Sequence, residues 1–374
     1  MSEASEPSAE LSALRDEISE VDRGLLELLR RRMDLAAEVG RIKAEAGLPI
    51  VVRGVEDRVL TRARQKAEEC GVSEEVLESI FQAIMRGSVE RQHRMGISLR
   101  EQRGERVLIV GGAGGMGNWL RNFLGLAGHS VDIVDPSLAG LPEARGRFAE
   151  LGLVGDLDAY AAIFVTVPLV RMPAVLTAVV ARRPRGIVVE VASIKDHLTD
   201  AFAAGKELGV RMIALHPMFG PGKSPYEPLT FVLATQREPE VEQRELEPLL
   251  SHPYTKLVPV PFAHHDRLMG WLLGLAHLTS MVFGSALTRS GIVPRELHDC
   301  ASTTFLRQAG TALSVLSEDP DLYLDIQRLN PHRHEVYRAA REGLERLTAL
   351  VDARDREGFR EALAEARQAL AGKV

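Results

Sequence analysis

The sequence predicts a multidomain protein with an all-α N-terminal module, an α/β domain built on a parallel sheet, and an all-α C-terminal domain. Apolar residues recur at helical spacing in the first hundred residues, and short β-rich runs then alternate with helix-length segments. After about residue 260 amphipathic helical stretches return. At 374 residues the chain exceeds what one core usually organises. We therefore expect domains at 1–100, 104–260 and 261–374.

The composition is that of an ordinary soluble protein, with 45% hydrophobic and 26% charged residues. A net charge of −6 gives no basic footprint for nucleic acid. The opening segment MSEASEPSAE lacks the features of a signal peptide, and no apolar run approaches the ~20 residues of a membrane span. Cys70 and Cys300 form no CxxC pair. These observations predict a cytoplasmic protein without a nucleic-acid or membrane partner.

The N-terminal module is expected to contain one long and two shorter helices. Apolar residues from Leu11 to Ile42 follow alternating steps of three and four, a heptad seam that Arg32 interrupts. Gly47 and Pro49 are expected to end this helix. The other two are expected at 56–69, before Gly71, and from Ser73 as N-cap to about Met95.

Five β-rich runs follow the linker REQRGER, and the segments between them are mostly long enough for helices. This alternation predicts a doubly wound parallel sheet. The runs are RVLIVGG, VDIVD, AIFVTVP, GIVVEVAS and RMIALHP.

The first run leads directly into a GxGxxG turn formed by Gly112, Gly114 and Gly117, with a helical segment after it. This is the context in which the motif binds a dinucleotide. Asp135 ends the second run, 18 residues after Gly117, where a carboxylate bonds the ribose hydroxyls and repels the extra phosphate of NADP. The sequence therefore predicts a Rossmann-type domain that binds NAD.

Two polar side chains follow later strands, Ser193 in EVASIK and His216 in ALHPMFG. Ligands of an open parallel sheet gather at the carboxyl ends of its strands. A neutral histidine there can accept a substrate hydroxyl proton while hydride leaves for NAD. A histidine in this position is also often only a packing or capping residue.

These motifs, together with His265-Asp266, His277 and EDPDLYLDI, resemble prephenate dehydrogenase from about residue 105 to the end of the chain. The resemblance implies that His216 assists removal of the ring hydroxyl proton and that Ser193 orients this hydroxyl. It also implies that His277 binds substrate and that His265-Asp266 positions the helix carrying it. Decarboxylation with aromatisation makes the family's reaction effectively irreversible.

One position departs from that resemblance. Ser314 stands where the family carries an arginine for the prephenate carboxylate, and a serine cannot make the bidentate contact of a guanidinium. Arg307, two helical turns earlier on the same face, is the candidate replacement for substrate binding. A variant cyclohexadienyl acid as substrate is the alternative.

Residues 10–95 resemble the all-helical chorismate mutase module fused to such dehydrogenases. The signature positions are Arg15, Arg32, Lys43, Glu56, Ser88 and Gln92. Chorismate rearranges without covalent catalysis, so the site needs cations for two carboxylates and donors for the ether oxygen. By this resemblance Lys43 and Gln92 are catalytic and the other four bind substrate.

Helix geometry supports this set. Lys43 lies 11 residues after Arg32 on nearly the same face, about 16 Å along the helix, so the two cations can flank one dianion. Arg15 lies about 25 Å from Arg32, which predicts that it serves the site of a partner chain in an interlocked dimer. Ser88 and Gln92 continue the apolar stripe of the third helix. Alternatively, Arg32 only fixes the register of a coiled coil.

The mutase resemblance also has gaps. Val52 and Val55 replace an aspartate and an arginine that are usual in the family, with Arg53 and Arg58 as possible substitutes. Because of these changes, the open alternatives include a mutase activity that is weak, one that is altered in its substrate, and one that is lost.

The leading hypothesis is a bifunctional, homodimeric enzyme of tyrosine biosynthesis that acts on chorismate and prephenate, with feedback inhibition by tyrosine implied by the resemblance. The alternatives are a monofunctional dehydrogenase with a dimerisation module, the same chemistry on amino-substituted analogues, and a 3-hydroxyacid dehydrogenase. Two groups contain residue types that bind metals, His264 and His265 with Asp266, and His332 with His334. A metal site is nevertheless not expected.

Overall fold

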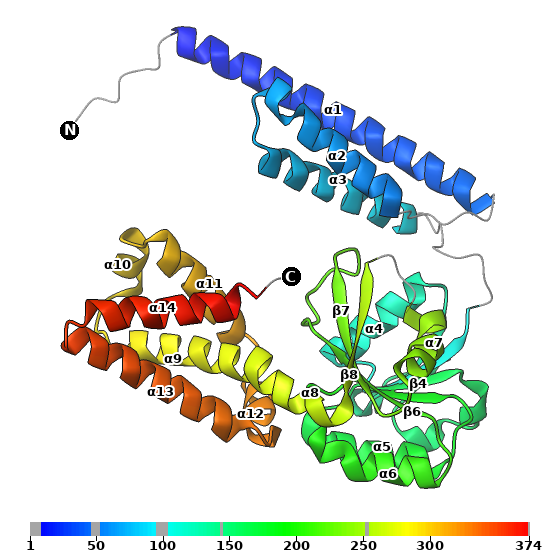
Figure 1. Cartoon of the computed structure of the whole chain (residues 1–374). Helices are drawn as coiled ribbons and strands as arrows, with labels where there is room; N and C mark the ends of the chain where they lie inside the picture. The colour runs from blue at the N-terminus through cyan, green and yellow to red at the C-terminus, as the bar shows by residue number, and fades with distance from the viewer. Residues whose placement is uncertain (1–8, 46–52, 95–103, 143–144, 251–253, 373–374) are drawn as a thin grey trace. The chain divides into compact units, whose positions relative to one another are not determined.

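The computed structural model describes residues 9–45, 53–94, 104–142, 145–250 and 254–372. Chain contacts divide it into two compact units. One holds Met1–Ile163, Pro217–Phe231 and Gln243–Leu257, and the other holds Phe164–His216, Val232–Glu242 and Val258–Val374. The predicted fold class is confirmed, with a helical module first, then a Rossmann-like sheet, then helices to the end (Figure 1).

The helical module consists of α1 (Ala9–Glu45), α2 (Arg53–Cys70) and α3 (Glu74–Arg94). α3 packs against both other helices, which lie side by side with it in Figure 1. Gly71 ends α2 with φ +64°, a conformation that glycine adopts without strain. Ser73 Oγ accepts the Val76 amide at the start of α3. The three predicted helices are confirmed, although α2 begins three residues before the expected start; Gly47, Pro49 and Met95 lie outside the described residues.

The apolar seam of α1 is not covered within the chain. Its nine predicted members are each between 42% and 63% exposed, while the small residue Ala37 is buried. Large apolar side chains in a continuous row at this exposure are typical of an interaction surface. The seam consists of Leu11, Leu14, Ile18, Val21, Leu25, Leu28, Leu35, Val39 and Ile42.

Eight strands form one sheet in the order β3-β2-β1-β4-β5-β6-β7-β8. The pairs β1/β2, β2/β3 and β5/β6 are parallel. The first six strands thus have the order 3-2-1-4-5-6 of a doubly wound dinucleotide-binding sheet. The strands are β1 (Arg106–Val110), β2 (Ser130–Val134), β3 (Arg147–Phe148), β4 (Ala162–Val165), β5 (Ile187–Glu190), β6 (Met212–Pro217), β7 (Leu229–Thr235) and β8 (Thr255–Pro261).

The five predicted β-rich runs are confirmed as β1, β2, β4, β5 and β6, and their side chains are almost entirely buried. Strands buried on both faces read as continuous apolar runs, which is why these five are visible in the sequence. The remaining helices of this region connect or flank the strands. They are α4 (Gly115–Leu126), α5 (Met172–Ala181), α6 (Thr199–Glu207) and α7 (Pro239–Leu250).

The C-terminal region is helical, as predicted. α13 and α14 form an antiparallel pair (Figure 1), joined by an ion pair between Arg346 and Glu365 at 2.7 Å. The helices are α8 (Phe262–Met269), α9 (Ala276–Thr288), α10 (Pro294–Asp299), α11 (Thr303–Leu316), α12 (Pro320–Leu329), α13 (Arg333–Asp352) and α14 (Arg356–Leu370).

A π-helical turn, Gly270–Leu275, joins α8 to α9. Such turns insert a residue into the α-helical count and leave a carbonyl to be satisfied from outside. Here Gln327 donates to the Gly274 carbonyl at 3.0 Å, and the Tyr337 hydroxyl donates to Gln327 at 2.8 Å. Within the described residues, the combined stretch Phe262–Thr288 is also the one helix long and apolar enough to cross a membrane by length and composition.

Candidate active site

The glycine-rich turn after β1 has the backbone that the motif requires. Gly111 has φ +87°, and a Cβ on Gly112 would lie 2.5 Å from Ile133, so neither position accepts a side chain without strain. An added Cβ at Gly114 would have only the Gly111 carbonyl within 4 Å, at 3.4 Å. Gly117 is buried in the first turns of α4. The turn therefore leaves open space at the N-terminus of α4, where a pyrophosphate binds.

Asp135 lies at the end of β2, beside this turn. Its Oδ2 accepts the Ala113 amide at 3.0 Å, and its Oδ1 accepts both the amide and hydroxyl of Ser137 at 3.0 and 2.7 Å. Partial burial raises the carboxyl pKa, but these hydrogen bonds outweigh it and hold the pKa below the ordinary value. The ionised carboxylate is thus fixed next to the glycine-rich turn.

These residues fit an NAD molecule by their own chemistry. The exposed glycine turn accommodates phosphates without side-chain obstruction, and the helix start offers amide donors. The half-buried carboxylate of Asp135 is an acceptor for ribose hydroxyls.

The loop after β6 is bound to α4 through Trp119. The Trp119 indole N–H donates to the Lys223 carbonyl at 2.6 Å, and its ring lies 4.7 Å from that of Phe219. Phe231 contacts both rings, at 6.4 and 5.2 Å between centroids. Pro221 would lie 3.2 Å from a Cβ on Gly115. This loop therefore borders the glycine-rich turn.

His216 occupies the carboxyl end of β6, as predicted, with only 3% of its surface exposed. Its Nδ1 lies 3.1 Å from His265 Nε2, and His265 Nδ1 lies 2.7 Å from Asp266 Oδ1. Burial, followed by the neighbouring His265 and Lys195, lowers the pKa of His216 well below 6.5. The imidazole is therefore neutral at neutral pH and able to accept a proton.

Asp266 connects this histidine pair to the loop after β5. Its carboxylate accepts the Lys195 amide at 2.9 and 3.0 Å and the Asp196 amide at 2.7 Å. Burial raises its pKa, but His265 and these amides bring the pKa below the ordinary value. Asn330 donates to the Asp266 backbone carbonyl at 2.8 Å, which holds the start of α8 independently of the carboxylate.

A fully buried ion pair lies beneath the site. Lys195 Nζ donates to Glu190 Oε1 at 2.6 Å and to the Leu215 carbonyl at 3.0 Å, and both charged side chains are 0% exposed. The other Glu190 oxygen accepts the Ala192 amide at 2.8 Å. Burial lowers the pKa of Lys195 and raises that of Glu190, while their mutual attraction opposes both shifts. This pair was not predicted, although charges inside the apolar run IVVEVASIK signal a buried partner.

Ser193, predicted to orient the hydroxyl, is half-buried in the same loop between Ala192 and Ile194, which are both buried. The loop is held on either side of the serine, by Glu190 at Ala192 and by Asp266 at Lys195. Its hydroxyl therefore sits on an anchored backbone.

His277 is half-buried near the start of α9. Its ring lies 4.4 Å from that of Tyr323 in an edge-to-face arrangement, and its Nδ1 is buried with no hydrogen-bond partner among the described residues. Burial lowers the pKa of His277 to about 4. A buried ring nitrogen without a partner is costly, so this nitrogen is available to a bound molecule or to water.

Arg307 and Ser314, the two positions considered for the substrate carboxylate, both lie on exposed surface of α11. The Ser314 hydroxyl donates to the Thr311 carbonyl at 2.9 Å, one turn back in its own helix. In the described residues of a single chain, no ion pair is recorded for Arg307. Its role in carboxylate binding stays a prediction.

In the helical module, two polar residues of α3 contact α1 at separate points, Ser88 at Arg32 and Gln92 at Ala36. Arg32 Nη1 donates to Ser88 Oγ at 2.6 Å, and Gln92 Nε2 donates to the Ala36 carbonyl. Ser88 and Gln92 are only 6% and 7% exposed, and Gln92 Oε1 is buried with no hydrogen-bond partner among the described residues. Burial lowers the pKa of Arg32. Polar groups thus occupy positions of an otherwise apolar interface.

The other three predicted mutase residues belong to α1 and α2. Lys43 is half-buried near the end of α1, and Arg15 is exposed on the same helix, far from Arg32 along its axis. Glu56 belongs to α2, as do Arg53 and Val55, but the side chains of all three lie outside the described part of the chain, and Val52 lies outside it altogether.

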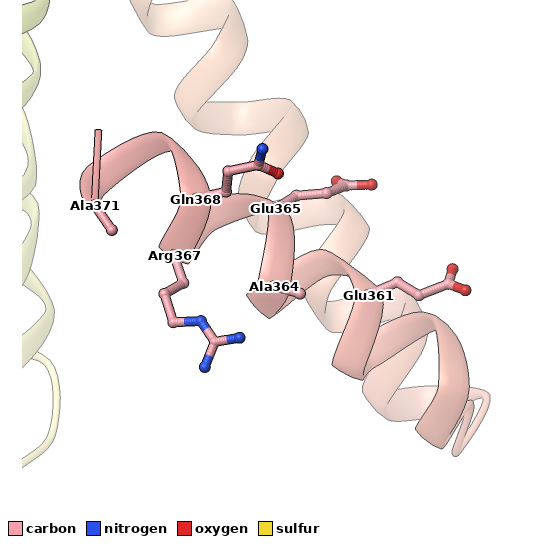
Figure 2. Close-up of a pocket in the computed structure, with 6 residues that line it drawn as sticks. All are labelled: Glu361, Ala364, Glu365, Arg367, Gln368 and Ala371. Carbon is pink, nitrogen blue, oxygen red and sulfur yellow. The ribbon is translucent and has the colours of Figure 1, made fainter. Parts of the chain in front are cut away.

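The hollow on α14 in Figure 2, about 580 Å³ in volume, is not part of either site. Its lining residues come from the second half of α14 and from Ala371 directly after it, and the side chains drawn point outward from the helix. Among the described residues no group of His, Cys, Asp and Glu is arranged to hold a metal ion.

Two family models match separate parts of the chain. Residues 14–93 match the chorismate mutase type II family, and residues 261–365 match the dimerization domain of prephenate dehydrogenase. The T-protein of Enterobacter agglomerans is 29% identical over 351 residues, covering 94% of this chain and 90% of that protein. A solved structure of prephenate dehydrogenase from A. aeolicus superposes with a TM-score of 0.55 at 16% identity, covering 72% of this chain and 98% of that one.

Two Streptomyces relatives carry amino-substituted names. A 4-amino-4-deoxychorismate mutase from Streptomyces venezuelae is 34% identical over 76 residues, 20% of this chain and 74% of that protein. A 4-amino-4-deoxyprephenate dehydrogenase from Streptomyces pristinaespiralis is 27% identical over 273 residues, 71% of this chain and 91% of that protein.

The part of the chain built on the parallel sheet is an NAD-dependent dehydrogenase, and the helical module ahead of it is of the mutase type. The chain belongs to the bifunctional chorismate mutase/prephenate dehydrogenase family. It is an oxidoreductase and an isomerase in one polypeptide.

Proposed function

We propose that this enzyme converts chorismate to prephenate in its helical module. Prephenate with NAD then becomes 4-hydroxyphenylpyruvate, CO₂ and NADH in its dehydrogenase part. The observation that carries the second half is the neutral His216, buried at the carboxyl end of β6 and hydrogen-bonded to His265. For the first half it is the hydrogen bond from Arg32 to Ser88, beside the equally buried Gln92 one turn further along α3.

In the dehydrogenase, Gly112, Gly114, Gly117 and Asp135 hold NAD, which when bound accepts hydride from the carbon bearing the hydroxyl. His216 takes the hydroxyl proton as that carbon is oxidised. The carbon–carbon bond to the ring carboxylate then breaks, CO₂ leaves, and the electron pair moves through the ring to the oxygen. That oxygen takes the proton back from His216, so the product is a phenol and no proton is lost.

The remaining dehydrogenase residues position the substrate. Ser193 orients the hydroxyl from its anchored loop. His277 offers its unpaired Nδ1 to the substrate, and Arg307 supplies a cation for a carboxylate. A neutral His277 binds the substrate by hydrogen bonding rather than by charge. The positive charge that neutralises the substrate carboxylate must therefore come from Arg307.

In the mutase, Arg32 and Lys43 bind the carboxylates of one chorismate, and Arg15 of a second chain completes the site. Ser88 and Gln92 provide polar groups on the α3 side of the site. Gln92 Oε1, which has no partner among the described residues, accepts a hydrogen bond from the substrate. Glu56 contributes from α2. Catalysis needs only this electrostatic frame and a shape that holds the compact conformer.

The domain division 1–100, 104–260 and 261–374 belongs to the proposal. So do a homodimer covering the α1 seam, feedback inhibition by tyrosine, and a cytoplasmic location. The exposed seam of α1 and the match to a dimerization domain support the dimer.

The test is turnover of chorismate with NAD by the purified enzyme, with chorismate loss and NADH formation followed separately. Both signals are expected. Chorismate consumption without NADH, even when prephenate is added, would refute the dehydrogenase half. NADH from added prephenate but no chorismate loss would refute the mutase half and favour a module used only for dimerisation.

A second candidate is the same chemistry on the 4-amino-4-deoxy series. This candidate is favoured by the two Streptomyces relatives and by three departures from the family pattern, at Val52, Val55 and Ser314. Parallel kcat/KM measurements on both substrate series decide between them. A higher value for the amino-substituted pair would replace the first candidate.

A further inference from the structure

We infer that His265 and Asp266 are positioning residues that fix the tautomer of His216, keeping its Nε2 a hydrogen-bond acceptor. The inference rests on the proposed role of His216 as the group that takes the hydroxyl proton. It assigns to this pair a direct action on His216 rather than only a structural role in α8.

The geometry forms one continuous chain of hydrogen bonds. It runs from Asp266 Oδ1 through His265 Nδ1 at 2.7 Å, and from His265 Nε2 to His216 Nδ1 at 3.1 Å. Asp266 is 5% exposed, His265 is 0% exposed and His216 is 3% exposed. With so little access to solvent, each ring nitrogen in the chain depends on its protein neighbour for a partner.

The protonation pattern follows from the Asp266 end. Its carboxylate already accepts the amides of Lys195 and Asp196, and an ionised carboxylate accepts only. His265 must therefore carry its proton on Nδ1. Burial, the largest effect, lowers the pKa of His265 and keeps the ring neutral, so its Nε2 is an acceptor. His216 must then donate from Nδ1, which leaves its own Nε2 without a proton.

Lys195 and Asp266 are the charged groups around this chain of hydrogen bonds, and they act in opposite directions on His265. The Lys195 ammonium opposes protonation of both histidines, and Glu190 holds that ammonium in place at 2.6 Å. Asp266 favours a positive charge on His265 but acts on His216 only through that ring. His216 is thus neutral before reaction, and when it briefly holds the substrate proton its Nδ1–H already points at an acceptor.

Because the proton returns to the product oxygen, the site needs no exit for it. A closed and buried chain that holds one proton for the length of a single turnover is sufficient. This agrees with the near-complete burial of all three side chains.

The first experiment needs no variant. With ¹⁵N-labelled histidine in the full-length protein, two-bond proton–nitrogen correlation spectra distinguish protonated from unprotonated ring nitrogens. His216→Asn identifies the His216 signals. We expect protonated Nδ1 and bare Nε2 for both His216 and His265. A proton on Nε2 of His216 at neutral pH would overturn the inference whether or not the enzyme turns over any substrate.

The second experiment uses Asp266→Asn. The amide group placed against His265 donates instead of accepting, which reverses the tautomer of both rings and leaves His216 Nε2 protonated. We expect kcat to fall about 10²–10⁴-fold, the range for loss of a general base. NAD affinity should be unchanged, and the His216 spectrum should show the reversed pattern. A spectrum and kcat like those of the parent would refute the inference.

The third experiment compares two replacements of His265. Gln places a carbonyl near the position of Nε2 and keeps an acceptor for His216, whereas Leu removes it. His265→Gln should retain kcat to within about tenfold, and His265→Leu should lose at least the lower end of the general-base range, about 10². Equal losses in both would show a packing role only. The exposed neighbour His264→Gln serves as the matched control.

Discussion

Arg32 on α1 and Ser88 on α3 lie 56 residues apart in sequence, yet Arg32 Nη1 donates to Ser88 Oγ at 2.6 Å. In the sequence, Arg32 interrupts the apolar seam of α1 and Ser88 continues the apolar stripe of α3. The hydrogen bond fixes the guanidinium on the inner side of the module. An arginine whose only function was to set coiled-coil register would face the partner helix of the seam instead, so this contact favours the binding role.

The module should form its mutase site from two chains. Arg15 lies about 25 Å along α1 from Arg32, so Arg15→Ala and Arg32→Ala should each be inactive as pure homodimers. Mixing the two under conditions that exchange subunits should restore about half the parental rate per heterodimer, because one of the two sites then receives both arginines. Verified heterodimers without activity, from a parent that is active, would place each site within one chain.

Asp135 should determine the choice of cofactor. In the double variant Asp135→Ser/Ser137→Arg, the first change removes the carboxylate and the second supplies a cation for the extra phosphate of NADP. The ratio of kcat/KM for NAD over NADP should fall by about tenfold or more, equivalent to about 1.4 kcal/mol. Ser137→Arg alone is the control, since Asp135 remains. An unchanged ratio in the double variant would remove Asp135 from the cofactor site.

His216→Asn should abolish dehydrogenation selectively. Loss of a general base costs about 10²–10⁴-fold in rate, whereas neither NAD binding nor the helical module depends on this ring. NADH formation from prephenate and chorismate consumption are measured on the same preparation. NADH production within tenfold of the parent would refute the assignment.

His277 should make stability depend on pH. Its folded pKa is about 4 and its unfolded pKa about 6.5, so below pH 6.5 only the unfolded chain takes up the proton. The stabilisation is complete above pH 6.5 and is lost as pH falls toward 4. The measurement is the free energy of unfolding in urea at pH 7.5 and at pH 5.5. The parent should lose more of it than His277→Gln between these pH values, by up to about 1 kcal/mol because the ring is only half-buried. Identical losses in both proteins would contradict this.

The sequence predicted the elements whose pattern is local. The α1 seam and the five buried strands repeat apolar residues at a fixed period, and GxGxxG with Asp135 follows a single βαβ unit. The strand β8 was not predicted, because it contains Pro259 and Pro261. Proline is tolerated there because β8 is the last strand of the sheet, where one row of amides has no strand to bond.

What the sequence could not predict depends on contacts between distant segments. The π-turn at Gly270–Leu275 has no periodic signal, because its stability depends on Gln327 and Tyr337 from later helices. His265 was identified with Asp266 as part of a motif, but its hydrogen bond to His216 spans 49 residues. Only the packing of α8 against the ends of β5 and β6 brings the three side chains together.

The Glu190–Lys195 ion pair has a consequence for how this sequence can evolve. Removing one partner of a buried pair leaves an uncompensated charge and costs roughly 3–5 kcal/mol, a large part of the roughly 5–15 kcal/mol that keeps a typical domain folded. Replacing both with apolar residues of similar volume is often neutral. Single substitutions at either position should therefore be purged, and an alignment of relatives should show positions 190 and 195 changing together, as a covarying pair inherited as a unit.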